Sequence, residues 1–334
     1  MSFKRIDAED FVVSSDFITS TLWSGDTPTL TEFHTSSIQQ NGSSGNYYLS
    51  VYQTSSLEAD AQVQFDIVYA NSNGSGSIPY NSTIPGNSPS KTMYGQYRAL
   101  ILEDENGQFI FGDDNNFITG SHFWVLSIDR ARYKESLFPG SLNLTLSGSG
   151  GEIFLTDNSK TQTINQFIGT SRVYQLVSGS NGTPSSAGAY VPNSGSYGLV
   201  FPELGTILLN PEAINESIGV SPVLTQTSNQ QNTSLLFEAI NEGMYFRLNS
   251  QETISSNYIF VRSRNSEFNY TENPTFIKSN GEVIVSNFIN HPQTYVTTVG
   301  LYNDNNELLA VAKLSRPILK DFTKESLIRV KLDF

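Results

Sequence analysis

Hydrophobic and polar residues alternate along much of this chain, which is the pattern of β-strands that bury one face. The clearest case is the C-terminal run SLIRVKLDF, residues 326–334. Its even positions from Ile328 to Phe334 are all apolar, whereas its odd positions from Leu327 to Asp333 include Arg, Lys and Asp. We therefore expect a half-buried strand that uses the C-terminus in a sheet and directs its even-numbered side chains to the core.

Shorter runs of the same kind predict further strands, with turn residues between them. These runs are residues 47–53, 61–70, 122–128, 141–147, 152–156, 172–178, 244–249 and 257–263. The dipeptide Asn-Gly favours the type I′ turn of a β-hairpin. It predicts one hairpin over residues 98–112, turning at Asn106–Gly107, and another over 276–285, turning at Asn280–Gly281. A third hairpin with a longer loop, Asn303–Asn306, is predicted over residues 299–314.

Helix signals are few. Asn210 followed by Pro211 is typical of an N-cap and a first helical residue, and it predicts a short helix in NPEAINESI. The segment Ser234–Met244 has apolar residues on one helical face and Gly243 as a stop, so it predicts a second helix. Residues 131–137 predict at most one more helical turn.

These elements predict a mainly β fold of two antiparallel β-sandwich or barrel-like domains with a few short helices. Two stretches rich in Gly, Ser, Asn and Pro, Asn71–Lys91 and Ser178–Tyr197, are predicted to be long loops. With the second loop as the boundary, we predict an N-terminal β domain at 1–177, a linker or loop region at 178–215 and a C-terminal β domain at 216–334. For the first loop, contact with a neighbouring chain and a plain surface loop are both open.

Charge and composition narrow the range of partners. The 334-residue chain has a formal net charge of −13, whereas nucleic-acid binding needs a basic surface that displaces counterions, so we expect no nucleic-acid partner. No apolar run approaches the roughly 20 residues that span a bilayer, and the N-terminus lacks the apolar core of a signal peptide. No membrane partner is therefore expected. The absence of cysteine excludes disulfides and thiolate sites.

No constellation of residues indicates catalysis or a cofactor. The three histidines, His34, His122 and His291, lie far apart in sequence, and there is no G-x-S-x-G motif. Acidic clusters near Asp104 and Asp304 suit calcium in their oxygen content, but turn chemistry alone also explains them. Paired carboxylates for glycoside hydrolysis stay open, because a sequence does not show their separation in space. We predict no catalytic residue, no cofactor and no metal site.

Basic residues alternate in two segments that we predict to be strands. On a strand each set points to one side, where it would pair with carboxylates of a neighbouring subunit or guard a sheet edge against unwanted pairing. Both interpretations are open. With two apolar residues of the first long loop, the candidate interface comprises Arg130, Arg132, Lys134, Arg262, Arg264, Tyr80 and Ile84.

Several long phrases of the sequence carry a family resemblance. They are IDAEDFVVSSDFITSTLWSGDTPTL, SPSKTMYGQYRALILEDEN, IDRARYKESLFPGSLNL, IFVRSRNSEFNYTENPTF and TTVGLYNDNNELLAVAKLSRPILK, and the last two lie in the strongest region, residues 210–334. These phrases resemble structural proteins of large tailed bacteriophages, including the cyanophage group. The resemblance covers most of the chain and carries no catalytic residue. It implies a tail- or baseplate-associated virion protein that is made in the host cytoplasm.

The resemblance therefore predicts a virion structural protein of a tailed bacteriophage. It would act in tail or baseplate assembly through contacts with other virion proteins and with copies of itself, as a homo-oligomer within a symmetric particle. A receptor- or glycan-binding tail adhesin is the main alternative, because aromatic and Asn-rich loops can stack on sugars and hydrogen-bond to them. A virion-associated glycan hydrolase is a third.

Overall fold

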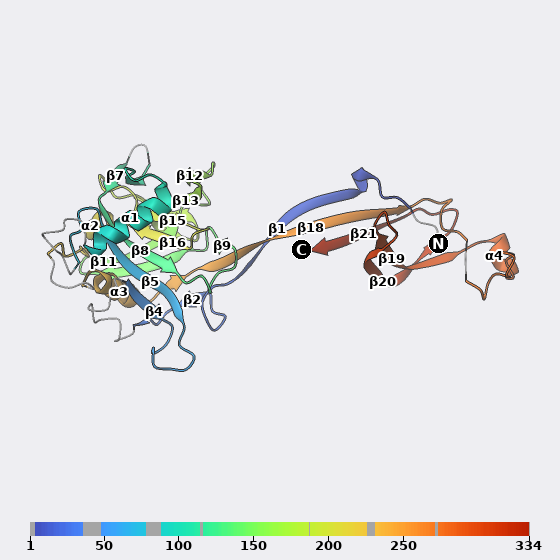
Figure 1. The fold of residues 1–334 in the computed structure, drawn as a ribbon, viewed down its shortest axis with the longest axis horizontal. Helices are drawn as coiled ribbons and strands as arrows, with labels where there is room; N and C mark the ends of the chain where they lie inside the picture. The colour runs from blue at the N-terminus through green and yellow to red at the C-terminus, as the bar shows by residue number, and fades with distance from the viewer. Residues whose placement is uncertain are drawn as a thin grey trace. The chain divides into compact units, whose positions relative to one another are not determined.

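The structure is a computed structural model that describes residues 4–35, 48–77, 88–113, 116–186, 188–225, 231–270 and 273–333. It is mainly β with a few short helices, which confirms the predicted fold class (Figure 1). The chain forms two compact units. Unit 1 comprises Met1–Phe17 and Thr253–Phe334, and unit 2 comprises Ile18–Glu252.

Unit 2 is built around one 13-stranded antiparallel sheet. Along the sheet the strands are β2 (Thr29–Leu30), β17 (Phe246–Arg247), β10 (Asn143–Gly148), β11 (Gly151–Asp157), β13 (Ser171–Ser180), β15 (Gly198–Phe201), β16 (Thr206–Leu209), β8 (His122–Ile128), β5 (Val63–Asn71), β4 (Tyr48–Tyr52) and β3 (His34–Thr35). Two short strands, β12 (Gln166–Ile168) and β14 (Thr183–Pro184), pair with β13. Apart from the hairpin predicted over residues 98–112, each predicted strand of this unit overlaps one of these elements.

The sheet of unit 2 curls around its main hydrophobic core. Six strands lie between β17 and β5 in the sheet order, yet the rings of Phe246 and Phe65 pack edge to face with their centroids 5.4 Å apart. Trp23 closes the same cluster, because its ring packs on both phenylalanines and its Nε1 donates to the Phe246 carbonyl at 3.0 Å. The concave face is thereby filled by large side chains, and its aromatic contacts join distant parts of the sheet.

Two helices also pack into this inner core. Helix α2 (Pro211–Ile218) begins at Asn210, whose side chain accepts from the Glu212 backbone N–H as an N-cap. Helix α3 (Gln231–Gly243) buries Leu236 and Ile240 among the core residues. Both predicted helices are therefore confirmed, and α3 ends at Gly243 as expected.

The outer face of the sheet is covered over β5, β8, β16 and β15 by a second hydrophobic cluster. Helix α1 (Pro89–Leu102) contributes Tyr94 and Ile101 to it, and the hairpin of β6 (Phe109–Gly112) and β7 (Phe117–Gly120) contributes Phe109 and Phe111. The prediction of a hairpin over residues 98–112 is wrong, because 98–102 are the last turn of α1. Tyr94, Tyr97 and Ile101 follow the helical period, and Pro89 suits a first helical turn.

The boundaries of the two units differ from those of the predicted domains. Residues 178–215 contain β15, β16 and most of α2, so they form part of the core of unit 2 instead of a linker. The first predicted loop, 71–91, ends where α1 begins at Pro89, and its residues 78–87 lie outside the described residues. The second, 178–197, is partly ordered by β14 and by the bridge between Val191 and Gly195.

Unit 1 has two β layers and a small helix, α4 (Ser286–Asn290). The first layer takes strands in the order β1 (Phe11–Thr21), β18 (Asn249–Ser263) and β21 (Ser326–Asp333), and the second is the hairpin of β19 (Thr294–Tyr302) and β20 (Leu308–Lys320). A short strand, β9 (Ser136–Leu137) of unit 2, pairs with the first residues of β18, which belong to the same unit. Ion pairs of Lys4 with Glu267 and of Arg262 with Asp10 tie the N-terminal segment into unit 1.

The predicted C-terminal strand is confirmed as β21. Ile328 and Val330 are buried, Leu332 is half-buried, and the odd positions from Leu327 to Asp333 are exposed. Inward residues of β21 pair with inward residues of β18, for example Val330 with Ile259. The hairpin at Asn303–Asn306 is confirmed as β19–β20, and the predicted hairpin at Asn280–Gly281 is present as a tight turn closed by one bridge between Ile277 and Val283.

Candidate functional site

The first predicted basic row does not lie on a strand. Arg130, Arg132 and Lys134 lie in the turn after β8, so their alternation does not place them on one face. Arg130 donates to the Tyr133 carbonyl and lies over its ring, 4.7 Å from the centroid. Lys134 pairs with Glu252 at 2.5 Å. Through these contacts within the chain, Arg130 and Lys134 stabilise the turn.

The second predicted basic row is divided by the end of β18. Arg262 lies in the strand and pairs with Asp10 at 3.0 Å, whereas Arg264 lies just beyond it, where its backbone N–H donates to Glu267. The other two residues of the candidate interface, Tyr80 and Ile84, lie outside the described residues. Of the described candidates, Arg130, Arg132 and Lys134 belong to unit 2, whereas Arg262 and Arg264 belong to unit 1. The candidate interface therefore stays a prediction.

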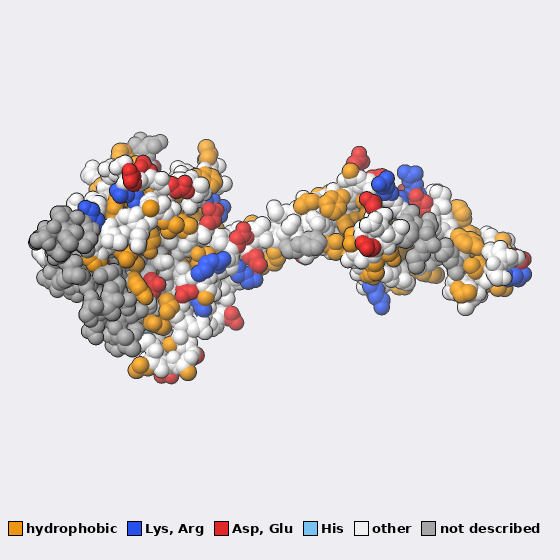
Figure 2. Space-filling view, viewed as in Figure 1, with side chains coloured by type: hydrophobic (Ala, Val, Ile, Leu, Met, Phe, Trp, Pro, Cys, Tyr) orange, Lys and Arg blue, Asp and Glu red, His pale blue; other side chains and the backbone are white. Residues whose placement is uncertain are grey.

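Among the described residues of unit 1, more large apolar side chains are exposed than buried. The buried core of this unit comprises five residues, Ile259, Val299, Leu301, Ile328 and Val330. In contrast, many large apolar side chains of its strands and loops are exposed, and Figure 2 shows hydrophobic side chains on the surface of this unit. The exposed residues include Phe11, Val12, Val13, Phe268, Tyr270, Ile284, Ile289, Tyr295, Leu308, Leu309, Val311, Phe322 and Leu327.

The exposed apolar residues of the hairpin β19–β20 lie on its outward face. Ala310 and Ala312 pair with the buried Leu301 and Val299, so they point to the core. Val311, between them, pairs with Gly300 and points to the opposite side, where it is exposed. This two-stranded hairpin therefore has a packed face and an apolar face that is open among the described residues.

The three-stranded layer of unit 1 also has long edge strands. Strand β1 is 11 residues long, and it forms one edge of its sheet, with β21 at the other. Within the described ranges, no further strand pairs with the outer side of either. Exposed edge strands carry unpaired backbone N–H and C=O groups and are templates for association, and Val12 and Val13 add apolar side chains to this edge.

A groove of about 500 Å³ lies on the outer face of the unit 2 sheet, where α1 does not cover it. Its floor is formed by β17, β10 and β11, and its rim by the end of β13 and the residues after α3. The lining residues are Asn143, Leu144, Thr145, Glu152, Phe154, Leu155, Gly179, Ser180, Asn181, Gly243, Met244, Tyr245 and Arg247. The groove mixes aromatic, amide and charged groups, and none of them was predicted as a site residue.

Gly243 allows the end of α3 to form one wall of this groove. A Cβ atom at this position would lie 2.2 Å from the Thr145 carbonyl oxygen, so only glycine lets the helix approach β10 this closely. The Thr145 backbone N–H then donates to the Tyr245 carbonyl at 2.9 Å. Met244, between Gly243 and Tyr245, has a left-handed φ of 48°. This tight turn presents Met244 and Tyr245 at the groove.

Two titratable groups of unit 2 with shifted pKa values, Asp66 and His122, lie outside the groove. Asp66 accepts from the Ser50 hydroxyl at 2.6 Å, and burial, assisted by Asp129, raises the pKa of the Asp66 carboxyl. Burial lowers the pKa of His122, and Glu212, at 3.7 Å, opposes that shift. None of these groups lines the groove.

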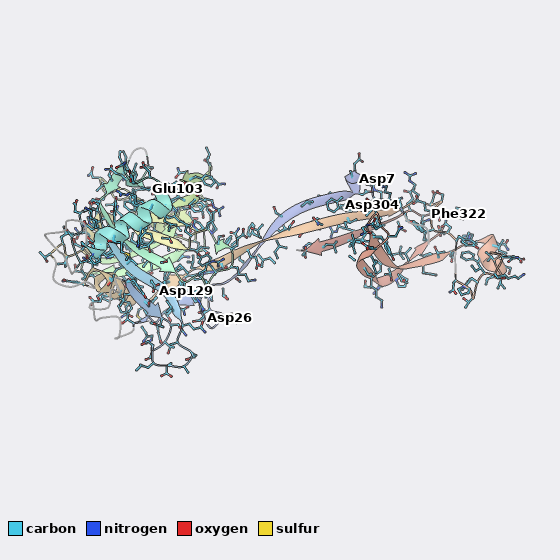
Figure 3. The ribbon with its side chains drawn as sticks, in the orientation of Figure 1. Asp7, Asp26, Glu103, Asp129, Asp304 and Phe322 are labelled. Carbon is cyan, nitrogen blue, oxygen red and sulfur yellow. The ribbon has the colours of Figure 1, made fainter. Side chains whose placement is uncertain are left out.

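Of the two acidic residues noted at predicted turns, Asp104 takes part in its turn, whereas Asp304 is exposed and lies 4.0 Å from Arg5. Asp104 accepts from the backbone N–H of Asn106. Figure 3 shows the labelled Glu103 and Asp129 of unit 2 well apart from each other. Among the residues that the structure describes, no group of three or more His, Asp or Glu side chains is placed to hold a metal ion.

Comparison with models of known families, with curated proteins and with solved structures finds no match. No helix in the described part of the chain has the length and apolarity needed to cross a membrane. The candidate sites therefore rest on the geometry of this chain alone. They are the open apolar strands of unit 1 and the groove of unit 2.

Proposed function

We propose that this protein is a structural subunit of a tailed-bacteriophage virion, a tail or baseplate component that acts through protein–protein contacts. The single observation that carries the proposal is the open apolar surface of the strands in unit 1. In this proposal unit 1 is the module through which copies of the chain and other virion proteins associate, in a symmetric homo-oligomer.

The physical basis is the imbalance between buried and exposed apolar area in unit 1. A two-stranded hairpin is marginal in water unless its faces are packed, and β19–β20 has only its inner face covered. Burying a Leu or Val side chain contributes about 1.5–3 kcal/mol, so covering Leu309 and Val311 would stabilise the module substantially. Contiguous exposed apolar patches of this kind mark protein–protein interfaces.

The sequence resemblance supports the same proposal from a different direction. The phrases that resemble phage structural proteins are most extensive over residues 210–334, and unit 1 takes most of its residues from that region. The proposal places the protein in the virion after synthesis in the host cytoplasm. It assigns the chain no catalytic role.

Self-association is tested with a matched pair of surface variants. Leu309→Asp puts a charge on the open face of the hairpin, where the side chain is 68% exposed, and Leu57→Asp puts one on unit 2, where the side chain is 88% exposed. Native mass spectrometry should show an oligomer for the wild type and for Leu57→Asp, and smaller species for Leu309→Asp. A wild type that stays monomeric at about 50 μM, or two variants with equal assembly, would contradict the role of unit 1.

Location is tested on phage particles. Antibodies against the purified protein should detect it in gradient-purified virions of the encoding phage, at a fixed copy number per particle. A reconstruction of the particle should then contain density for both units of the chain. Absence of the protein from infectious particles would overturn the proposal.

A further inference from the structure

Strand register sets the order of the side chains along the groove of unit 2. Antiparallel partners point to the same side of a sheet. Arg247 lies opposite Asn143, Phe154 opposite Thr145, and Glu152 opposite Ser147. These three positions on β10 are two residues apart, so from first to last they span about 13 Å. The groove therefore has a cationic end, an aromatic middle and an anionic end.

The cationic end of the groove is the Arg247 guanidinium, which has a hydrogen-bond donor without an acceptor in the described protein. Arg247 takes part in none of the ion pairs between described residues, and its Nε is buried without a hydrogen-bond acceptor. A buried donor without an acceptor is unfavourable. A guanidinium binds a carboxylate through two parallel hydrogen bonds, so a ligand carboxylate that draws this side chain into the groove would remove that cost.

The middle of the groove is a stacking surface. Phe154 is 59% exposed although it projects from an inner strand of the sheet, and Tyr245 and Met244 stand beside the same cavity. Aromatic faces bind C–H groups through dispersion and their negative face. The paired strand fixes the backbone of Phe154, and its side chain has only two torsions, so little conformational entropy is lost when a flat ligand stacks on the ring.

Amides and a carboxylate surround this stacking surface. Asn143 and Asn181 form two hydrogen bonds with each other. The Asn143 side-chain amide donates to the Asn181 side-chain oxygen at 3.0 Å, and the Asn181 backbone N–H donates to the Asn143 side-chain oxygen at 2.8 Å. Asn181 has an amide Nδ2 with no acceptor among the described residues. Together with Ser180 and Glu152 it offers donors and acceptors to ligand hydroxyl groups.

We infer that this groove binds an acidic saccharide, with a sugar carboxylate on Arg247, a pyranose ring on Phe154 and ring hydroxyls toward Asn181, Ser180 and Glu152. The ligand class is the uronic or other sugar acids of polysaccharides. A sugar ring combines an apolar face with a rim of hydroxyls, and this matches an aromatic floor within a polar border.

The geometry favours a saccharide over a peptide. Peptides commonly bind by adding a strand to an open sheet edge, by laying a helix in a long apolar groove or by docking a proline-rich segment. The floor strands β10 and β11 are paired on both sides, so the groove offers no edge to a peptide. Nucleic acid would need several cations for its phosphates, whereas Arg247 is the one basic residue lining the groove in the described part of the chain.

The test uses the full chain and two disaccharide probes of equal length in isothermal titration calorimetry: cellobiouronic acid, which carries one carboxylate, and the neutral cellobiose. Cellobiouronic acid should bind at least about tenfold more tightly than cellobiose. Arg247→Gln should abolish that preference, and Phe154→Ala should weaken binding of both probes. Phe167→Ala is the matched control, because Phe167 is 60% exposed on the same unit but does not line the groove; it should bind as the wild type does.

Three results would overturn the inference: no binding of cellobiouronic acid, equal binding of it by Arg247→Gln and wild type, or tighter binding of an acidic aromatic peptide such as acetyl-Asp-Gly-Tyr. Thermal unfolding of each variant, compared with that of Phe167→Ala, separates loss of a ligand contact from loss of the fold. The inference does not depend on the proposed assembly role. Arg247→Gln should keep the oligomeric state of the wild type, and Leu309→Asp should keep saccharide binding. The assembly role and the saccharide site can therefore be contradicted independently of each other.

Discussion

The ring of Phe246 packs edge to face on the ring of Phe65 at 5.4 Å, although 181 residues of sequence separate them and six strands lie between them in the sheet. This contact is possible only because the sheet of unit 2 curls. Both side chains are fully buried, and Trp23 packs on each. The pair therefore closes the concave core on which α2 and α3 also lie.

Truncation of this pair should destabilise unit 2. We expect Phe65→Ala and Phe246→Ala each to lower the free energy of unfolding by about 3–5 kcal/mol, because each leaves a cavity in a closed core. The double variant should show a coupling of about 0.5–1.5 kcal/mol. Urea denaturation followed by Trp fluorescence measures both quantities, with the exposed Phe167→Ala as the control. Losses below 1 kcal/mol would mean that the sheet does not close through this contact.

Alanine at Gly243 and at Gly95 should have opposite effects. A Cβ at Gly243 meets the Thr145 carbonyl oxygen at 2.2 Å, whereas a Cβ at Gly95, inside α1, has no atom within 4 Å. Gly243→Ala should therefore destabilise unit 2 and displace the wall of the groove. Gly95→Ala should stabilise the protein by about 0.5–1 kcal/mol, since alanine has the higher helix propensity. Melting temperatures and saccharide affinities of the two variants test this, and equal effects would contradict it.

The stability of unit 2 should depend on the ionisation of Asp66. Burial raises the pKa of this carboxyl above its ordinary value of 3.8, so the folded state favours the protonated form. Its contribution to stability is fully present below pH 3.8 and is lost as the pH rises through the folded pKa. Asp66→Asn removes this loss and retains an acceptor for the Ser50 hydroxyl.

We therefore expect Asp66→Asn to be more stable than the wild type at neutral pH, with the advantage shrinking toward pH 3.8. Chemical denaturation at a series of pH values measures the difference. Asp104→Asn, at a turn, is the control for removing a negative charge. An advantage that grows as the pH falls would have the wrong sign.

In unit 1, the buried Lys320 should be essential to the end of the hairpin. Its side chain is fully buried, and Nζ donates to the carbonyls of Asn265 and Asp321 and to Oδ1 of Asn269 at 3.0–3.2 Å. Lys320→Met leaves these oxygens without their donor, and hydrogen bonds to a charged group are each worth about 1.5–3 kcal/mol. Amide hydrogen exchange of β19 and β20 should accelerate. Lys313→Met, exposed on the same strand, should leave it unchanged.

Local patterns in the sequence determined much of the secondary structure. The alternation over 326–334 predicted β21 and its buried side, because one face of an edge strand packs on the core and the other meets solvent. Asn210 and Pro211 predicted the start of α2, and Gly243 the end of α3, because capping depends on residues a few positions apart. Helix α1 carried similar signals at Pro89 and Tyr94, but the Asn-Gly dipeptide after it favoured a hairpin.

The sequence did not determine which distant strands pair. Unit 1 joins the first residues of the chain to its last quarter, and unit 2 places β17 between β2 and β10. The predicted domains followed the order of the chain, because a local pattern shows that a residue is buried but not what it is buried against. The sequence did not predict the groove for the same reason. Asn143, Phe154 and Arg247 are unremarkable in sequence, and only the register of three strands places them on one face, since each strand satisfies its backbone with a partner far along the chain.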